Sequence, residues 1–516
     1  MSPVYPRREE ASSGRRRPSF RGRCLVNAAE DGYNGSVTSP TIVWFRLDLR
    51  LEDNPALAEA VARGLAIPVF IWAPEEEGTS APGAASRWWL HRSLAALDES
   101  LRRRGSRLIL RRGPAGSALR ELARETGSKA VFWSRRVEPS LAARDARVQD
   151  ALRAEGLEVK TFNSSLLFEP GDVKTLTGNP YQVFTPFWRA CLERPEPEAP
   201  LPAPASLGDA RALPRGETLD AFKLLPKVEW TAGLGAAWVP GEAGARERLD
   251  AFVELAAGGY HESRDLMAED GVSRLSPHLH FGEISPRAVW AAVSRRAAGA
   301  PGRGPEAYLR ELGWREFAHH LLARFPRTVD RPLRPEFESF PWRSDVDGFE
   351  RWTRGRTGYP AVDAGMRQLW RSGWMHNRAR MVAASFLVKD LLVDWRQGAA
   401  WFWDTLVDAD QANNTLGWQW VAGCGADAAP FFRIFNPVLQ GKKFDPEGIY
   451  VKRWVPELAE LPPKLIHEPW KADAAHLGAA GGYPLPIIDH GRARVRALAA
   501  LSLAANNRAS VESERK

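Results

Sequence analysis

The sequence predicts an α/β domain with a doubly wound parallel sheet, followed by an all-α domain. Short apolar runs alternate with helical stretches up to about residue 170, and only helical patterns follow residue 246. Strands that alternate with helices favour a parallel sheet with right-handed crossovers. Apolar residues at three- and four-residue spacing favour helices in the second part.

Four buried strands are predicted in the first part, at residues 41–45, 68–72, 107–110 and 130–133. Helices are predicted between them at 56–63, 88–103 and 117–126. No glycine-rich phosphate fingerprint follows the first strand, so the sequence does not support a dinucleotide site of the Rossmann type.

Changes in composition along the chain predict five segments. Residues 1–40 are Arg-rich with little apolar periodicity, so we expect disorder. A basic arm that touches DNA and a start codon assigned too far upstream are alternatives, whereas a signal peptide lacks its apolar region. The α/β domain covers 41–170, a Pro- and Gly-rich connector 171–245, the helical domain 246–505 and a polar tail 506–516.

Composition excludes several classes of protein. The 516 residues suffice for two or three domains, and no apolar run approaches the ~18 residues of a membrane helix. A formal net charge of +8 favours polyanion partners. Three widely spaced cysteines form neither a metal-ligand pattern nor a disulfide framework, so we expect a reduced, cytoplasmic location.

Tryptophan is unusually frequent, since the chain has 21 and twelve lie between Trp314 and Trp470. Crowded indoles suggest stacking or electron transfer, although large aromatic cores are the alternative. Residues 408–420 combine two aspartates, two asparagines and two tryptophans. This segment suits a pocket for a flat ring with polar edges, and a helix cap followed by packed indoles is the alternative.

Five further segments, at 314–317, 358–363, 373–381, 389–395 and 432–437, accompany this one. In order and spacing they resemble the flavin domain of the photolyase and cryptochrome family. The resemblance runs from about residue 41 to about residue 470, and it is strongest to the bacterial cyclobutane-pyrimidine-dimer photolyases. It implies FAD as a cofactor.

The resemblance implies a diphosphate clamp at Tyr260, Ser273, Arg274, Leu275 and Ser276, for which a helix N-cap is the alternative. Val272 stands where many relatives carry Thr, so one hydroxyl contact is missing. The residues implied around the flavin and its adenine are Tyr308, Glu311, Arg315, Trp374, Asn377, Arg380, Asp408, Asp410 and Asn414. Arg380 and Asp408 are expected to pair beside the ring, or to form a purely structural ion pair.

Asn414 is expected beside flavin N5, where its carboxamide tolerates the anionic reduced flavin, FADH−. Plant cryptochromes typically carry Asp at this position and animal ones Cys, so Asn favours the enzyme over the sensor. Trp342, Trp395 and Trp418 match the three tryptophans that relay electrons to the flavin. Packed indoles are the alternative for each.

The resemblance also implies a lesion pocket. Trp314 and Trp420 match the indoles that flank a flipped dimer, and Glu311 is expected to bond its 5′ base. Asn377 and Met381 stand where the (6-4) photolyases carry a His pair, which disfavours (6-4) repair. Contacts to the DNA backbone are expected from Arg264, Arg315, Arg378, Gln440 and Lys443, with solvated surface charge as the alternative.

Glu138 matches the position that binds methenyltetrahydrofolate, the expected antenna, although a deazaflavin or an empty site stays open. The implied function is light-driven repair of cyclobutane pyrimidine dimers in UV-damaged DNA, by electron transfer from excited reduced FAD to a flipped-out dimer. The alternatives are a cryptochrome-type photosensor and a protein that binds damaged DNA without chemistry. We expect a monomer.

Overall fold

The structure is a computed structural model that describes residues 39–514, except 210, 212, 300–301, 429–431 and 474–480, with side chains up to residue 504. The predicted extension at 1–40 therefore lies, but for its last two residues, outside the described part. In the described part, no helix combines the length and apolar character needed to cross a membrane.

Five parallel strands form one sheet in the order β3-β2-β1-β4-β5. They are β1 (Thr41–Phe45), β2 (Ala66–Trp72), β3 (Ile109–Arg112), β4 (Ala130–Ser134) and β5 (Glu158–Phe162). The four predicted strands are confirmed to within two residues. We did not predict β5, because this edge strand mixes polar with apolar residues and only Val159 is buried.

Helices cover both faces of the sheet, which confirms the doubly wound prediction. Val43 and Phe45 pack with α1 (Pro55–Ala62) and α2 (Ala84–Arg102). Ile42 and Trp44 pack with α3 (Ala115–Thr126) and α4 (Pro139–Ala154). Successive side chains of a strand point to opposite faces, so β1 must be apolar throughout. The sequence did not indicate α4, whose buried stripe includes Arg144 and Asp145.

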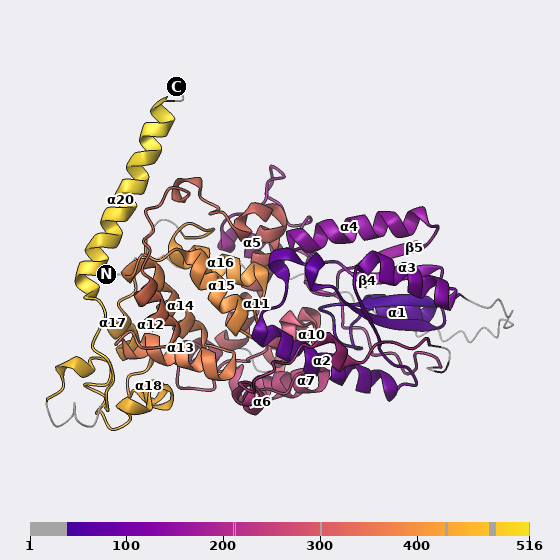
Figure 1. Cartoon of the computed structure of the whole chain (residues 1–516), viewed down its shortest axis with the longest axis horizontal. Helices are drawn as coiled ribbons and strands as arrows, with labels where there is room; N and C mark the ends of the chain where they lie inside the picture. Colours follow the sequence, from indigo (N-terminus) through magenta and orange to yellow (C-terminus); the bar gives the residue numbers. More distant parts are fainter. Residues whose placement is uncertain are drawn as a thin grey trace, which may run out of the picture. The chain divides into compact units, whose positions relative to one another are not determined.

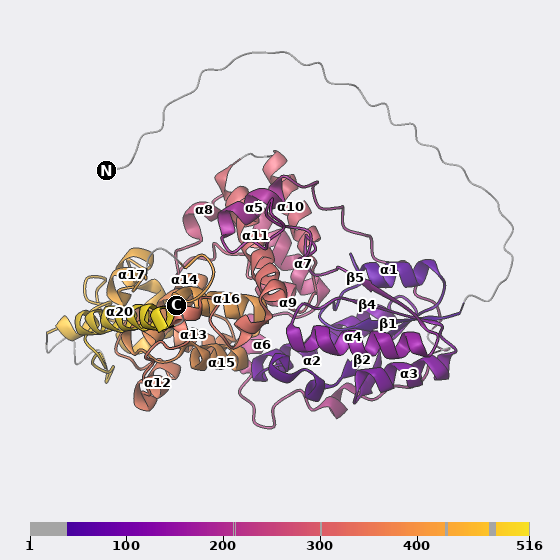
Figure 2. The same cartoon turned by 90° about the horizontal axis from the view of Figure 1, so that it is seen from above.

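The rest of the chain is helical, as predicted. Figure 2 shows α5, α8, α10 and α11 gathered together, and α11 packs on each of the other three. The helices are α5 (Phe184–Leu192), α6 (Ala232–Ala237), α7 (Glu242–Ala251), α8 (Tyr260–Ser263), α9 (Ser276–His280), α10 (Pro286–Gly299), α11 (Arg303–Arg324), α12 (Val346–Thr353), α13 (Pro360–Ser372), α14 (Asn377–Ser385), α15 (Trp395–Thr405), α16 (Gln411–Ala422), α17 (Pro437–Phe444), α18 (Ile449–Trp454) and α20 (His490–Glu514).

Helices lie in the two segments that the sequence predicted as a connector and a polar tail. α5 and α6 lie within the predicted connector, and α20 continues into the predicted polar tail (Figure 1). The stripe of α20 that meets the core is built from alanines, so its apolar signal is weak.

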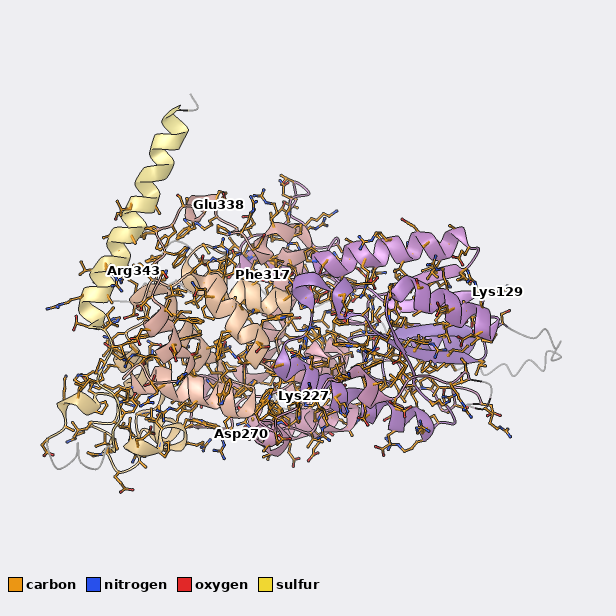
Figure 3. All side chains as sticks on the ribbon, in the orientation of Figure 1. Lys129, Lys227, Asp270, Phe317, Glu338 and Arg343 are labelled. Carbon is orange, nitrogen blue, oxygen red and sulfur yellow. The ribbon has the colours of Figure 1, made fainter. Side chains whose placement is uncertain are left out.

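The carboxyl ends of the strands face the helical part. Lys129, just before β4, lies at the far end of the sheet, whereas Phe317 on α11 lies inside the molecule (Figure 3). Arg50 follows β1 and is buried at this junction. Its guanidinium donates to the carbonyls of Ser164 (2.7 Å) and Gly282 (3.0 Å), so it links the sheet to the helices.

Candidate active site

A cavity of about 520 Å³, here called the large cavity, lies among α11, α14, α15 and α16. Its volume is in the range of small-molecule sites. The residues predicted to act on the lesion all line it, and they are Glu311, Trp314, Asn377, Met381, Asn414 and Trp420. The fold thus brings together side chains that lie about a hundred positions apart in the sequence.

A second cavity of about 290 Å³, here called the clamp cavity, adjoins the first. The two cavities share Glu311, Arg315, Asn377, Arg380, Asp408 and Asn413. The clamp cavity is also lined by the predicted Tyr260, Ser273, Leu275, Ser276, Tyr308, Trp374 and Asp410. One cavity rich in indoles and one rich in hydroxyls suit a ligand with two chemically different ends.

The hydroxyls of the clamp cavity are arranged around a tight turn at Arg274. This residue has a φ of +51°, and α9 begins two residues later. Tyr308 Oη donates to Ser273 Oγ (3.0 Å), and Trp374 Nε1 donates to Ser276 Oγ (3.4 Å). Burial raises the pKa of Tyr308 to about 12, so its hydroxyl stays neutral. The Arg274 guanidinium lies 5.3 Å from the centre of the Trp374 ring.

An ion pair between Arg380 and Asp408 lines both cavities. Arg380 Nη2 donates to Asp408 Oδ2 at 2.7 Å, and Arg380 Nε donates to the Met375 carbonyl at 2.8 Å. Asp408 Oδ1 is buried and has no hydrogen-bond partner among the described residues. A buried polar atom without a partner is costly, so the structure provides an acceptor for a ligand here.

Asp410 acts as a helix cap, which confirms one alternative for this segment. Its Oδ1 accepts from Asn413 N (2.8 Å) and Asn413 Nδ2 (2.7 Å) at the start of α16. Its Oδ2 lies 3.4 Å from His319 Nε2 and 3.7 Å from His280 Nδ1. Burial alone raises the pKa of Asp410, but the two histidines outweigh burial and hold it well below its ordinary value.

Asn414 lies one turn further along α16 and lines the large cavity. Its Nδ2 donates to the Ala399 carbonyl of α15 at 3.0 Å. A carboxamide has one donor end and one acceptor end. One N–H of this group is engaged with α15, so a ligand can meet Oδ1, which accepts, or the second N–H, which donates.

The two predicted lesion-flanking indoles have partners that the sequence did not indicate. Trp314 stacks on Phe184 of α5, with ring centres 3.7 Å apart and planes inclined by 9°. Trp420 faces the guanidinium of Arg433 at 5.4 Å. Arg433 and Asp427 also line the large cavity. Phe184 is distant in sequence and could not be found by a local pattern, whereas Arg433 follows the first residue of the 432–437 motif.

The three predicted relay tryptophans differ in their burial. Trp418 lines the cavity, and a Cβ atom placed on Gly398 would lie against its ring, so the first turn of α15, which begins at Trp395, passes close to it. Trp395 and Trp418 are buried, whereas Trp342 is partly exposed. The residue after Trp342 donates its backbone N–H to the Leu392 carbonyl, three residues before Trp395.

The residues predicted to contact DNA differ in their surroundings. Arg264 forms an ion pair with Glu311, and Arg378 forms one with Asp265. Arg315 Nη1 donates to the Ser165 carbonyl at 2.7 Å, so this guanidinium is engaged inside the protein.

Gln440 and Lys443 belong to α17, where Lys443 is exposed and Gln440 partly exposed. The Lys443 ammonium lies 5.0 Å from the centre of the Phe444 ring.

Glu138, the predicted antenna residue, precedes α4 and is 4% exposed. Both of its carboxylate oxygens accept from Arg136, with 3.0 Å between Arg136 Nε and Oε2. Burial raises the pKa of Glu138, but Arg136 outweighs burial and holds it below its ordinary value. Two smaller cavities adjoin the pair, of about 60 and 220 Å³, and are here called the sheet-edge cavities.

Comparison with known proteins gives one consistent result. The family model for the FAD binding domain of DNA photolyase matches residues 308–503, and the DNA photolyase model matches residues 41–205. The chain is 51% identical to a deoxyribodipyrimidine photo-lyase of Agrobacterium fabrum over 470 residues, which is 90% of this chain and 98% of the relative. It is 43% identical to cryptochrome-1 of Arabidopsis thaliana, over 92% of this chain and 72% of the relative.

Solved structures agree with this result. A class III photolyase from Agrobacterium tumefaciens superimposes with a TM-score of 0.88 at 50% identity, over 93% of this chain and all of that one. A cryptochrome from Synechocystis superimposes with a TM-score of 0.82 at 29% identity, over 89% of this chain and 99% of that one. The protein therefore belongs to the photolyase and cryptochrome family.

Proposed function

We propose that the protein repairs cyclobutane pyrimidine dimers in UV-damaged DNA in a light-driven reaction. The large cavity carries this proposal, because all six residues expected to act on a dimer line it. The relatives named deoxyribodipyrimidine photo-lyase support it, and they include that of Escherichia coli at 38% identity over 98% of its length.

The two adjoining cavities fit FAD. The clamp cavity offers the Ser273, Ser276 and Tyr308 hydroxyls to a diphosphate, and the buried Asp408 Oδ1 is an acceptor without a partner among the described residues. The Asn414 carboxamide, held through Nδ2 by the Ala399 carbonyl, can accept from a protonated ring nitrogen, so it tolerates the reduced state. When bound, reduced FAD excited by light supplies the electron that opens the dimer.

The residues of the large cavity hold the dimer. Trp314 and Trp420 stack on the flipped bases, at roughly 1–3 kcal/mol per base, and Phe184 fixes the plane of Trp314. Glu311 bonds the 5′ base, while Asn377 and Met381 line the wall without supplying an acid. Flipping costs least at a damaged step, so the pocket selects for damage.

The relay residues Trp342, Trp395 and Trp418 pass electrons to the flavin site. Their burial supports this role, because Trp342 is partly exposed whereas Trp418 lines the large cavity. Arg264, Arg378, Gln440 and Lys443 contact the DNA backbone, and Arg315 instead braces the cavity wall through Ser165. We expect a monomer in the cytoplasm.

A folate antenna at Glu138 stays a prediction that the side chains do not favour. Both carboxylate oxygens of Glu138 already accept hydrogen bonds from Arg136. A pterin at this position requires the ion pair to open.

A cryptochrome-type photosensor is the second candidate, because cryptochrome-1 and cryptochrome-2 of Arabidopsis thaliana are 43% and 41% identical to this chain. Repair is favoured over the photosensor by Asn414 and by the large cavity, which all six residues expected to act on the lesion line.

The test measures dimer loss from a UV-damaged oligonucleotide with purified, chemically reduced protein, in blue or near-UV light and in darkness. We expect restored thymines in light only. A protein that holds reduced FAD and repairs nothing in light contradicts the proposal and favours the photosensor.

A further inference from the structure

One ion pair joins the predicted DNA contacts to the predicted lesion contacts. Arg264 Nη1 lies 2.5 Å from Glu311 Oε1, and both side chains line the large cavity. Their side chains are 24% and 30% exposed, so solvent and a ligand can reach both. The residue expected to hold a phosphate is thus engaged with the residue expected to hold the dimer.

The other charged groups around the large cavity have different engagements. Arg315 is bonded to Ser165 and lies near Glu316, and Arg380 is paired with Asp408. Arg433 faces Trp420. Among the described residues, Arg264 is therefore the cation that holds Glu311.

The guanidinium of Arg264 can exchange its partner. Beyond Glu311 it lies 5.3 Å from the centre of the Tyr260 ring, a contact that does not depend on the carboxylate. A partly exposed ion pair is weak, and a phosphate offers guanidinium two oxygens in a matching geometry. DNA backbone placed at the cavity mouth therefore competes with Glu311 for the same cation.

We propose that Arg264 is a positioning residue that changes partner from Glu311 to a DNA phosphate and thereby frees Glu311 for the lesion base. This inference rests on the proposed function. The exchange couples binding of the DNA backbone to binding of the lesion base, because Glu311 becomes free only where a phosphate binds the Arg264 guanidinium.

The test is a double-mutant cycle on the affinity for undamaged DNA at fixed salt, which needs no repair. Glu311→Gln releases Arg264, so we expect it to tighten binding by about two- to fivefold, the range for an exposed pair. In the Arg264→Gln background the same change has no effect. Asp347→Asn, which removes the carboxylate of an exposed arginine pair on α12 that lines neither cavity, leaves affinity nearly unchanged.

If Glu311→Gln also tightens DNA binding in the Arg264→Gln background, the effect comes from the loss of a negative charge in general, and the proposal is overturned. No gain in either background also overturns it. A cycle that behaves as expected in a protein without light-dependent repair supports the exchange and rejects the repair function, so the two failures are distinguishable.

A second measurement uses dimer-containing oligonucleotides in which the phosphates near the dimer are replaced one at a time by neutral methylphosphonate. At saturating substrate, we expect one replacement to lower the repair yield of the wild type by about two- to fivefold. Arg264→Gln loses this sensitivity, and Arg351→Gln, whose cation pairs with Asp347 on α12, keeps it. Equal wild-type yields for all oligonucleotides limit Arg264 to affinity and overturn the proposal.

Discussion

The large cavity and the sheet-edge cavities were both expected to border a chromophore, and they differ in how their charged groups are paired. In the large cavity, Asp408 keeps one buried oxygen without a partner among the described residues, and Glu311 is held only by a partly exposed arginine. Beside the sheet-edge cavities, Arg136 occupies both oxygens of a nearly inaccessible Glu138.

This difference shows that the presence of an expected residue does not by itself make a site ready to bind a ligand. A matched position predicts which side chain is present, but a ligand needs hydrogen-bonding groups that the protein leaves incomplete. By this criterion the large cavity and the clamp cavity are prepared for a ligand, whereas the Glu138 pair is complete by itself. Four substitutions sharpen the contrast, beginning with the one of largest effect.

Trp395→Phe should abolish photoreduction of oxidised flavin. Trp395 is buried at the start of α15, next to the helical turn that supports Trp418, so a relay can serve the large cavity. Photoreduction is measured by the loss of oxidised-flavin absorption under light. The chemically reduced variant should repair dimers as the wild type does, and loss of repair in that state would give Trp395 a role in catalysis.

Arg136→Gln should lower the free energy of unfolding by about 3–5 kcal/mol, because it leaves a buried carboxylate unpaired. Glu138 is then the uncompensated charge, since Arg136 holds its pKa below the ordinary value against burial. Denaturant unfolding measures the loss. The double variant with Glu138→Gln should recover part of it, and an unchanged stability of Arg136→Gln would mean that the pair is open in solution.

Sequence reasoning reached the fold and most cavity-lining residues, for reasons that individual elements make clear. The predicted strands were found because parallel strands covered on both faces are apolar throughout, as in β1. β5 and α4 escaped because one is a half-polar edge strand and the other buries Arg144 and Asp145. Periodicity reports burial, and it fails where charges are buried or a strand is solvated.

The partners of the site residues were beyond reach of the sequence. No local pattern joins Phe184 to Trp314, Arg264 to Glu311 or Asp410 to His319, because each pair is set by tertiary packing. The segment 408–420 shows this limit well. The alternative of a cap is confirmed, since Asp410 caps α16, and the pocket for a flat ring stays a prediction that the cavity lined by Asp408 and Asn414 supports.

Asp408→Asn should weaken FAD binding by roughly 10- to 100-fold, the effect of losing a charged hydrogen-bond partner worth about 1.5–3 kcal/mol. The change keeps the shape of the side chain but removes the charge opposite Arg380 and from the unpartnered Oδ1. Flavin release under dilution measures the affinity. Glu138→Gln is the matched control at the other site, and FAD retention equal in both variants would contradict the contrast between them.

The smallest effect concerns the wall between the two sites. His280 and Asp410 line both the clamp cavity and a sheet-edge cavity, and His319, which also lines that sheet-edge cavity, lies 3.4 Å from Asp410 Oδ2. Burial lowers the pKa of His319, but Asp410 outweighs burial and raises it above its ordinary value of 6.5. A raised histidine pKa stabilises the fold fully below that ordinary value, and the contribution is lost as pH rises through the folded value.

We therefore expect the unfolding temperature to fall between pH 6 and pH 8. The loss of unfolding free energy is about 1.4 kcal/mol for each pH unit by which the pKa of His319 is raised. Asp410 acts in the opposite direction. Because its pKa is depressed, its contribution to stability is lost only as the pH falls below the ordinary aspartate range. Thermal unfolding of the wild type and His319→Gln at both pH values isolates the histidine. The His319→Gln variant should lose less stability than the wild type when the pH rises from 6 to 8. An identical loss in both proteins would mean that His319 is neutral in the folded protein and forms no ion pair with Asp410.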